Sequence, residues 1–353
     1  MPEVDLFRYK LSEAEHERIF QEEIVPDWLV GAVPQRDPVV VSVGGQPGAG
    51  KTTTTETIRV VLDRRGGALH VCGDFYKPYH PHYARLLRKD DTTAGAYTRL
   101  DTRLWHNKAE AYARERRFDV VTETAMADPA GFVESADAFR HAGYRVEAVI
   151  LAVPAAQSRL GILHRYAEQL QALGHGRYVA PTNHDASYTG MLESADLIDQ
   201  TQAVDEVRVY RRGNHLVYAN HLTVARQWAQ PATTRQALAT ERSRRWTAAE
   251  TTVFTERLLQ LAGELGAPWH LELAAIADLA RPLAHPDSTL SMALEHGTED
   301  VMGLFRHQLL EADHEPSPAP DDRTATDVIR ERLWPRWLEE QELEHEGDGW
   351  ELP

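Results

Sequence analysis

The sequence predicts an α/β fold in which a parallel β-sheet is flanked by helices and followed by a mostly helical C-terminal extension. Short apolar, β-branched runs alternate with stretches of helical spacing over the first two thirds of the chain, which is typical of parallel strands joined by right-handed crossover helices. A glycine-rich turn follows the first of these runs directly. After about residue 225 only helical spacing remains.

The first elements are the clearest. Residues 11–25 have apolar side chains at helical spacing, with Ser12 as a plausible cap. Residues 39–43, VVVSV, predict a strand that is buried on both faces. A helix then extends from the glycine-rich turn to about Arg65.

The alternation continues with further strands and helices. Strands are expected at residues 69–71, 119–123 and 145–153, and helices at 108–117, 131–141 and 154–173, with another helix closing near 191–195. Residues 206–210 and 215–218 flank a polar turn, which fits a terminal hairpin.

A length of 353 residues favours one large domain with an appendage. We expect a catalytic domain over residues 1–225 and a helical extension over residues 226–353, with helical spacing at 233–263 and 269–281. Residues 317–320, SPAP, are typical of a linker, and residues 311–353 contain 14 Asp or Glu against four Lys or Arg. The extension therefore ends in a strongly acidic tail.

The composition excludes or disfavours several classes of partner and location. A formal net charge of −16 disfavours nucleic acid and anionic membranes as partners, because like charges repel. Cys72 is the sole cysteine, which excludes an internal disulfide and predicts a small buried apolar residue. The charged N-terminus does not resemble a signal peptide, and no apolar run reaches the ~20 residues of a membrane span. A cytoplasmic location is expected.

The glycine-rich turn carries the most specific motif in the chain. Residues 45–52 fit the pattern G-x-x-x-x-G-K-[ST] at every fixed position, between a predicted strand and a predicted helix. Its glycines let successive N–H groups face phosphates, and the helix dipole adds positive potential. We assign nucleotide binding to Gly45, Gln46, Pro47, Gly48, Ala49, Gly50, Lys51, Thr52 and Thr53.

This loop predicts ATP and Mg²⁺ as cofactors and a P-loop kinase-like sheet. The Lys51 ammonium is expected on the β- and γ-phosphates, and the Thr52 hydroxyl on Mg²⁺. Asp74 and Glu123 follow the second and third predicted strands, so both lie at the rim of the sheet that faces the nucleotide. Asp74 is placed to accept a proton from an attacking hydroxyl. Either acid alone is equally compatible with a solvated strand end.

Two later arginines, Arg165 and Arg177, suit charge stabilisation during phosphoryl transfer, although each alone is more often a surface ion-pair residue. With these residues the chain resembles the zeta toxins, P-loop kinases of bacterial toxin–antitoxin systems. The resemblance covers about residues 11–222. It rests on GQPGAGKT, the D-x-[FY]-x-x-x-H-P stretch from Asp74 to Pro81, Glu123, the pair Arg165–Tyr166, and R-x-x-x-P-T-x-x-H-D from Arg177 to Asp185.

The resemblance implies a reaction and roles for the residues. Zeta toxins phosphorylate UDP-N-acetylglucosamine and related UDP-sugars, so this chain is expected to phosphorylate the sugar 3′-hydroxyl and block cell-wall precursor synthesis. By this likeness Asp74 is the general base, while Lys51, Arg165 and Arg177 bind and stabilise the transferring phosphate. Glu123 and Thr124 are expected to hold the amino sugar, and His80 is assigned to the substrate site or to fixing the loop after Asp74.

One departure affects the choice of acceptor. Thr124 is followed by Ala125 and Met126, where family members commonly have a glycine or a second hydroxyl residue. A kinase of another small molecule, such as an antibiotic or a nucleoside, therefore stays open, as does a nucleotide-gated regulatory module without turnover. The resemblance also implies a small helical antitoxin as a partner. The extension beyond residue 225 is either an accessory domain or an inhibitor in cis.

Overall fold

The computed structural model describes residues 5–288, 290, 291 and 303. The linker at 317–320 and the acidic tail predicted over 311–353 lie outside the described residues. The described chain forms a six-stranded sheet in the order β2-β3-β1-β4-β5-β6. Its strands are β1 (Val39–Gly44), β2 (Ala68–Cys72), β3 (Asp119–Thr124), β4 (Arg145–Leu151), β5 (Glu206–Arg211) and β6 (His215–His221).

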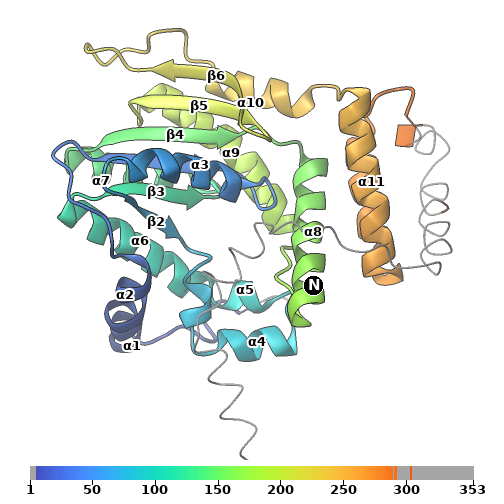
Figure 1. Ribbon diagram of the computed structural model, residues 1–353, viewed down its shortest axis with the longest axis horizontal. Coiled ribbons are helices and arrows are strands. Elements are labelled where there is room, and N and C mark those ends of the chain that lie inside the picture. Colours follow the sequence, from blue (N-terminus) through green and yellow to red (C-terminus); the bar gives the residue numbers. More distant parts are fainter. Residues whose placement is uncertain (1–4, 289, 292–302, 304–353) are drawn as a thin grey trace, which may run out of the picture. The chain divides into compact units, whose positions relative to one another are not determined.

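Five of these strands are parallel and the sixth is reversed. β1 pairs in parallel with β3 and β4, β2 pairs with β3, and β5 pairs with β4. β6 is antiparallel to β5, as the predicted hairpin requires. All six residues of β1 are buried, because β1 lies in the centre of the sheet with helices on both faces. The carboxyl ends of the five parallel strands therefore share one edge (Figure 1).

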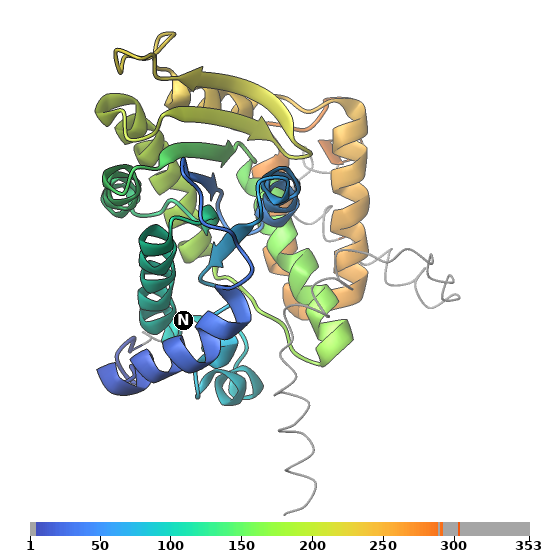
Figure 2. The same ribbon diagram turned by 60° about the vertical axis from the view of Figure 1, so that its left-hand side comes forward.

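Helices cover both faces of this sheet. The α-helices of the described residues are α1 (Glu13–Ile19), α2 (Val25–Trp28), α3 (Lys51–Asp63), α4 (Tyr83–Lys89), α5 (Ala94–Tyr97), α6 (Arg99–Arg116), α7 (Pro129–His141), α8 (Ala155–Leu173), α9 (Pro181–Thr201), α10 (Thr234–Ser243), α11 (Ala248–Leu265) and α12 (His270–Ala280). The turned view separates α3 on one face from α6, α7 and α9 on the other (Figure 2). The predicted α/β class with flanking helices is thus confirmed.

The sequence located most elements but not all of their limits. Ser12 caps α1 by accepting the Glu15 N–H, as expected. Cys72 is buried and free. By contrast, α6 begins at Arg99, nine residues before the expected helix, and α4 and α5 were not predicted. The helical stretch at 233–263 is two helices, because Thr247 and Glu250 form a capping box that begins α11.

The C-terminal helices share a core with α8. Leu160 and Leu163 of α8 belong to one buried cluster with Leu258 and Leu261 of α11 and Leu273 of α12. The domain boundary expected near residue 225 stays a prediction, but the described part of the extension packs directly on the predicted catalytic domain. No helix among the described residues is long and apolar enough to cross a membrane.

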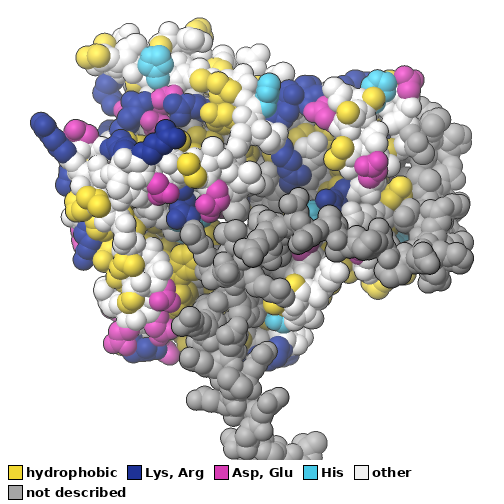
Figure 3. All heavy atoms as spheres, viewed as in Figure 1, with side chains coloured by type: hydrophobic (Ala, Val, Ile, Leu, Met, Phe, Trp, Pro, Cys, Tyr) yellow, Lys and Arg dark blue, Asp and Glu magenta, His cyan; other side chains and the backbone are white. Residues whose placement is uncertain are grey.

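Charge is unevenly distributed over the described surface. Lys and Arg side chains gather in the left and upper parts of the face in Figure 3, although the chain has a net charge of −16. Positive groups also concentrate at the carboxyl edge of the sheet, and these are described next.

Candidate active site

The phosphate loop has the backbone that its glycines predict. Gly48 and Gly50 have φ angles of +76° and +86°, which glycine adopts without steric cost. A Cβ on Gly48 would lie 1.9 Å from the Ser158 carbonyl oxygen, and one on Gly161 would lie 2.5 Å from the Gly48 carbonyl oxygen. The loop therefore needs glycine both for its turn and for its close contact with α8.

Lys51 begins α3 and turns back over this loop. Its ammonium donates to the Gly45 carbonyl oxygen at 2.7 Å. Burial lowers the pKa of Lys51, and the charges of Glu123 and Asp74 oppose that shift. The next two residues, Thr52 and Thr53, are exposed at the start of α3, where the N-terminal N–H groups and the helix dipole favour an anion.

Asp74 follows β2 and lies between two cations. Its carboxylate contacts Lys77 Nζ at 2.8 Å and Arg177 Nη2 at 2.9 Å, yet its side chain is 45% exposed. Burial alone would raise the pKa of Asp74, but the charges of Arg177 and Lys77 outweigh it and hold the pKa well below its usual value. Asp74 is therefore ionised at neutral pH and accessible to a ligand.

Arg165 and Arg177 approach Asp74 from another part of the chain. Arg165 lies on α8, and the Arg177 backbone N–H, beyond that helix, donates to Gln169 Oε1 at 2.7 Å. Arg165 Nε and Nη2 are buried and have no hydrogen-bond partner in the described structure. Burial and the neighbouring Arg177 lower the pKa of Arg165 to about 10, so it stays charged at neutral pH. An anionic ligand would satisfy these donors.

Glu123 lies at the end of β3, in a more enclosed setting. Its carboxylate contacts His70 Nε2 at 3.0 Å, and its side chain is 8% exposed. Burial opposes ionisation, but the hydrogen bond from His70 and the charge of Lys51 lower the pKa of Glu123. The Thr124 hydroxyl accepts the Met126 N–H at 3.0 Å and so shapes the turn after β3.

Met126, where the chain departs from the family pattern, fills the space beside the loop. It has a φ of +48° and is buried. A Cβ on Gly44 would lie 2.1 Å from the Met126 sulfur. The Met126 side chain therefore occupies the space that the missing side chain of Gly44 leaves at the end of β1.

The structure places His80 away from the exposed cluster around Asp74. Its side chain is fully buried, its Nε2 contacts the Asp101 carboxylate at 3.2 Å, and its Nδ1 accepts the His82 N–H at 3.3 Å. A substrate cannot reach this ring in the described arrangement. His80 instead holds the loop after Asp74, which was the other role that the sequence suggested.

The remaining loop residues contribute mainly backbone. The Gln46 side chain is fully buried and donates to the Val153 carbonyl oxygen and Ser158 Oγ, and Ala49 is also buried. Lys77 was missed by sequence reasoning, although a lysine three residues after a proposed base was a signal available in the sequence. Arg212, in the β5–β6 turn, was missed too; it donates to the Gly48 carbonyl oxygen at 2.8 Å.

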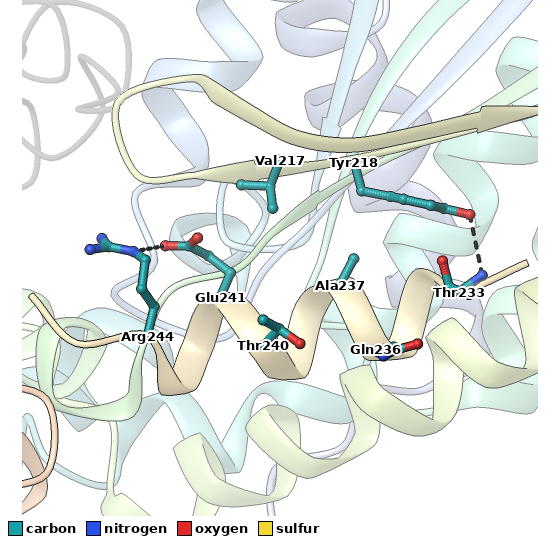
Figure 4. A pocket seen from close by; sticks show the side chains of 8 residues that line it. All are labelled: Val217, Tyr218, Thr233, Gln236, Ala237, Thr240, Glu241 and Arg244. Atoms are coloured by element: carbon teal, nitrogen blue, oxygen red, sulfur yellow. Dashed lines mark hydrogen bonds and ion pairs between the residues drawn. The ribbon is translucent and has the colours of Figure 1, made fainter.

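A separate groove of about 410 Å³ opens between β6 and α10. Val217 and Tyr218 form one side, and Thr233, Glu241 and Arg244 contribute to the other (Figure 4). It contains none of the residues assigned to phosphate binding or catalysis. Glu241 is engaged there by Arg211 and Arg244.

The arrangement around Asp74 suits phosphate chemistry. Lys51, Lys77, Arg165 and Arg177 each interact electrostatically with Asp74, and Lys51 also interacts with Glu123. The cluster therefore holds four cations and two carboxylates. A surplus of positive charge with unsatisfied guanidinium donors fits a polyphosphate, and the exposed Thr52 hydroxyl fits the Mg²⁺ that accompanies one.

Comparisons with known proteins agree on one family. The model of the zeta toxin family matches residues 28–223. Toxin PezT of Streptococcus pneumoniae is 22% identical over 190 residues, which cover 53% of this chain and 74% of PezT. Toxin zeta of Enterococcus hirae is 20% identical over 184 residues, covering 52% of this chain and 64% of that toxin.

A solved structure shares the fold. A chain from the PezAT chromosomal toxin–antitoxin system of Streptococcus pneumoniae superposes with a TM-score of 0.60 at 19% identity. The match covers 72% of this chain and 98% of that chain. The P-loop kinase-like sheet predicted from the sequence is thereby confirmed.

Proposed function

Because the chain belongs to the zeta toxin family, we propose that it is an ATP-dependent phosphotransferase with a toxic activity. The acceptor is the 3′-hydroxyl of the amino sugar of UDP-N-acetylglucosamine or a related UDP-sugar, and its phosphorylation blocks cell-wall precursor synthesis. ATP and this acceptor place the reaction in the cytoplasm.

One observation carries the proposal: an accessible carboxylate lies beside the phosphate loop within a cluster of cations. Asp74 is 45% exposed and is contacted by Lys77 and Arg177, while Arg165 has buried donors without partners. A pure nucleotide switch needs no carboxylate that can reach a second ligand, so the cluster favours transfer to an acceptor.

The residues divide the work of transfer. The loop N–H groups and Lys51 bind the β- and γ-phosphates, and Arg165 and Arg177 neutralise charge on the phosphoryl group as it moves. Asp74 orients the acceptor hydroxyl and takes its proton. Because its pKa is low, Asp74 is ionised, so its carboxylate can accept the hydrogen bond of the acceptor hydroxyl and take the proton as the hydroxyl oxygen bonds to phosphorus.

When bound together with ATP, Mg²⁺ would lower the negative charge on the phosphates during transfer. Thr52 is the residue of this chain that would hold it, through its exposed hydroxyl. Glu123 and Thr124 lie beside Asp74 at the ends of neighbouring strands, and we assign them to the amino sugar. His80 supports the loop that carries Asp74 rather than the sugar.

A separate antitoxin is part of the proposal. The solved relative comes from a toxin–antitoxin system, and we propose that a small helical antitoxin neutralises this chain as well.

A direct test is incubation of the full chain with ATP, Mg²⁺ and a panel of acceptors, followed by mass spectrometry. The panel holds UDP-N-acetylglucosamine, UDP-N-acetylgalactosamine, UDP-glucose, a nucleoside and an aminoglycoside. Addition of one phosphate to a UDP-amino sugar supports the proposal. Phosphorylation of the nucleoside or the aminoglycoside alone would replace it with another kinase activity, and ATP hydrolysis without any product would favour a regulatory module.

A further inference from the structure

We propose that Arg242 of α10 is a positioning residue that holds the phosphate loop in its binding conformation through Gln46. Arg242 lies outside residues 28–223, the segment that the family model matches. The inference rests on the proposed nucleotide site, and it gives the C-terminal extension a role in nucleotide binding.

Arg242 is buried at the back of the phosphate loop. The residue is 4% exposed. Nη2 donates to the Gln46 Oε1 atom at 3.1 Å, and Nη1 donates to the Tyr188 carbonyl oxygen at 2.7 Å. The guanidinium also lies over the Tyr188 ring, 3.9 Å from its centroid. It therefore joins α10, α9 and the loop in one contact.

Both polar atoms of the Gln46 side-chain amide have hydrogen-bond partners. Its amide nitrogen donates to the Val153 carbonyl oxygen at 2.7 Å and to Ser158 Oγ at 3.0 Å. Its amide oxygen accepts from Arg242. Because Gln46 is the second residue of the loop and is completely buried, fixing its side chain also fixes the direction of the adjoining backbone N–H groups.

The network extends to His184 and Asp185 in the first turn of α9. Ser158 Oγ lies 2.8 Å from His184 Nε2, and His184 Nδ1 lies 2.8 Å from Asp185 Oδ1. These contacts tie the back of the loop to α8 and α9. Arg242 is the member of the network that comes from the extension. Its side chain is long enough for the guanidinium to donate to both Gln46 and Tyr188.

The charge of Arg242 points to function rather than to stability alone. Among the described residues no carboxylate forms an ion pair with it, and its Nε has no hydrogen-bond partner. Burial lowers its pKa to about 10. A buried cation without a counter-ion is costly, and the phosphates of a nucleotide on the opposite side of the loop would reduce that cost. ATP binding and the Arg242 contact should therefore favour each other.

The test measures ATP affinity of the full chain by calorimetry, together with thermal unfolding. We expect Arg242→Met to raise the Kd for ATP about tenfold, because Gln46 Oε1 loses its donor. Arg242→Lys should recover part of that affinity, since it keeps the charge and one donor, whereas a role limited to packing would be served equally by Met. Arg235→Met is the matched control: Arg235 is on the same helix but forms an exposed ion pair with Asp196, and its loss should leave the Kd unchanged.

A double-mutant cycle tests the route through Gln46. Gln46→Met should weaken ATP binding, and adding Arg242→Met should then change little. Unchanged affinity in Arg242→Met, or fully additive effects, would overturn the inference while leaving the kinase proposal intact. If Arg242→Met does not fold, wild-type affinity in Gln46→Met overturns it alone. Absence of ATP binding by the wild-type chain would remove both.

Discussion

The ends of β2 and β3 carry the two acids of the site in opposite settings. Asp74, after β2, is 45% exposed and is held by Lys77 and by Arg177, a residue about a hundred positions later. Glu123, at the end of β3, is 8% exposed and is held by His70 of the neighbouring strand. One acid depends on contacts that the tertiary fold assembles, and the other on contacts within the sheet.

This difference indicates that two carboxylates at the same edge of the sheet have different roles. An enclosed carboxylate with a histidine partner is fixed and suits a constant hydrogen bond to a substrate. An accessible carboxylate between cations can exchange partners when an anionic substrate arrives, because the cations can turn to phosphate oxygens. We therefore assign chemistry to Asp74 and substrate positioning to Glu123.

The largest expected effect separates these two acids directly. Asp74→Asn should lower kcat by ~10²–10⁴-fold, because an amide cannot accept the hydroxyl proton. The Kd for ATP should stay close to the wild-type value or fall, since one negative charge near the phosphate site is removed. Steady-state kinetics with calorimetry measure both quantities.

Glu123→Gln is the matched variant on the neighbouring strand. It should raise the KM for the acceptor more than it lowers kcat, because Glu123 contributes a positioning contact. An equal loss of kcat in both variants would end the division of roles between the two strand ends.

The arginines should show the next largest effects. Arg165→Ala and Arg177→Ala are each expected to lower kcat by roughly 10²–10³-fold, with a smaller loss of ATP affinity, because their charge matters most at the transition state. Arg159→Ala provides a control on α8, since Arg159 is already paired with Glu272 at 2.7 Å and should alter kcat little. A rise confined to the KM for ATP would make Arg165 or Arg177 a ground-state binder.

The smallest effect concerns pH. Lys77 helps to hold the pKa of Asp74 well below its usual value. Lys77→Met removes that charge, so the pKa of Asp74 should rise and the acidic limb of the kcat/KM profile should move to higher pH. Activity should be lost first at low pH, where Asp74 becomes protonated, and change less above neutrality. A limb that stays in place, or moves to lower pH, contradicts the ion pair as the cause.

The sequence predicted the parts of the site that depend on local patterns. The phosphate loop, its glycine conformations and the acids at two strand ends followed from a motif between a strand and a helix. Lys77 and Arg212 did not, because their roles depend on the turns that bring them to Asp74 and to Gly48. His80 is a ring held in the interior by Asp101 of α6, a helix whose first turns the apolar periodicity did not indicate.

The extension shows the same limit. Helical spacing indicated α10, α11 and α12, but it could not show that Arg242 reaches Gln46. Nor could it show that α11 and α12 cover Leu160 and Leu163 of α8. Cutting the chain after residue 225 would expose this apolar face. The truncation would therefore lower the stability of the kinase domain, and its activity alone would not show whether the extension inhibits the enzyme.

The most direct test of the central claim follows the γ-phosphate of isotopically labelled ATP into UDP-N-acetylglucosamine. Single-turnover reactions compare the wild-type chain with Asp74→Asn, and the natural acceptor with its 3-deoxy sugar analogue. Phosphorus NMR then identifies the position of the phosphate on the product. We predict label on the 3′-hydroxyl with the wild-type chain, at least a hundredfold slower transfer with Asp74→Asn, and none with the analogue. Label recovered only as inorganic phosphate, or transfer by Asp74→Asn at the wild-type rate, would contradict the account.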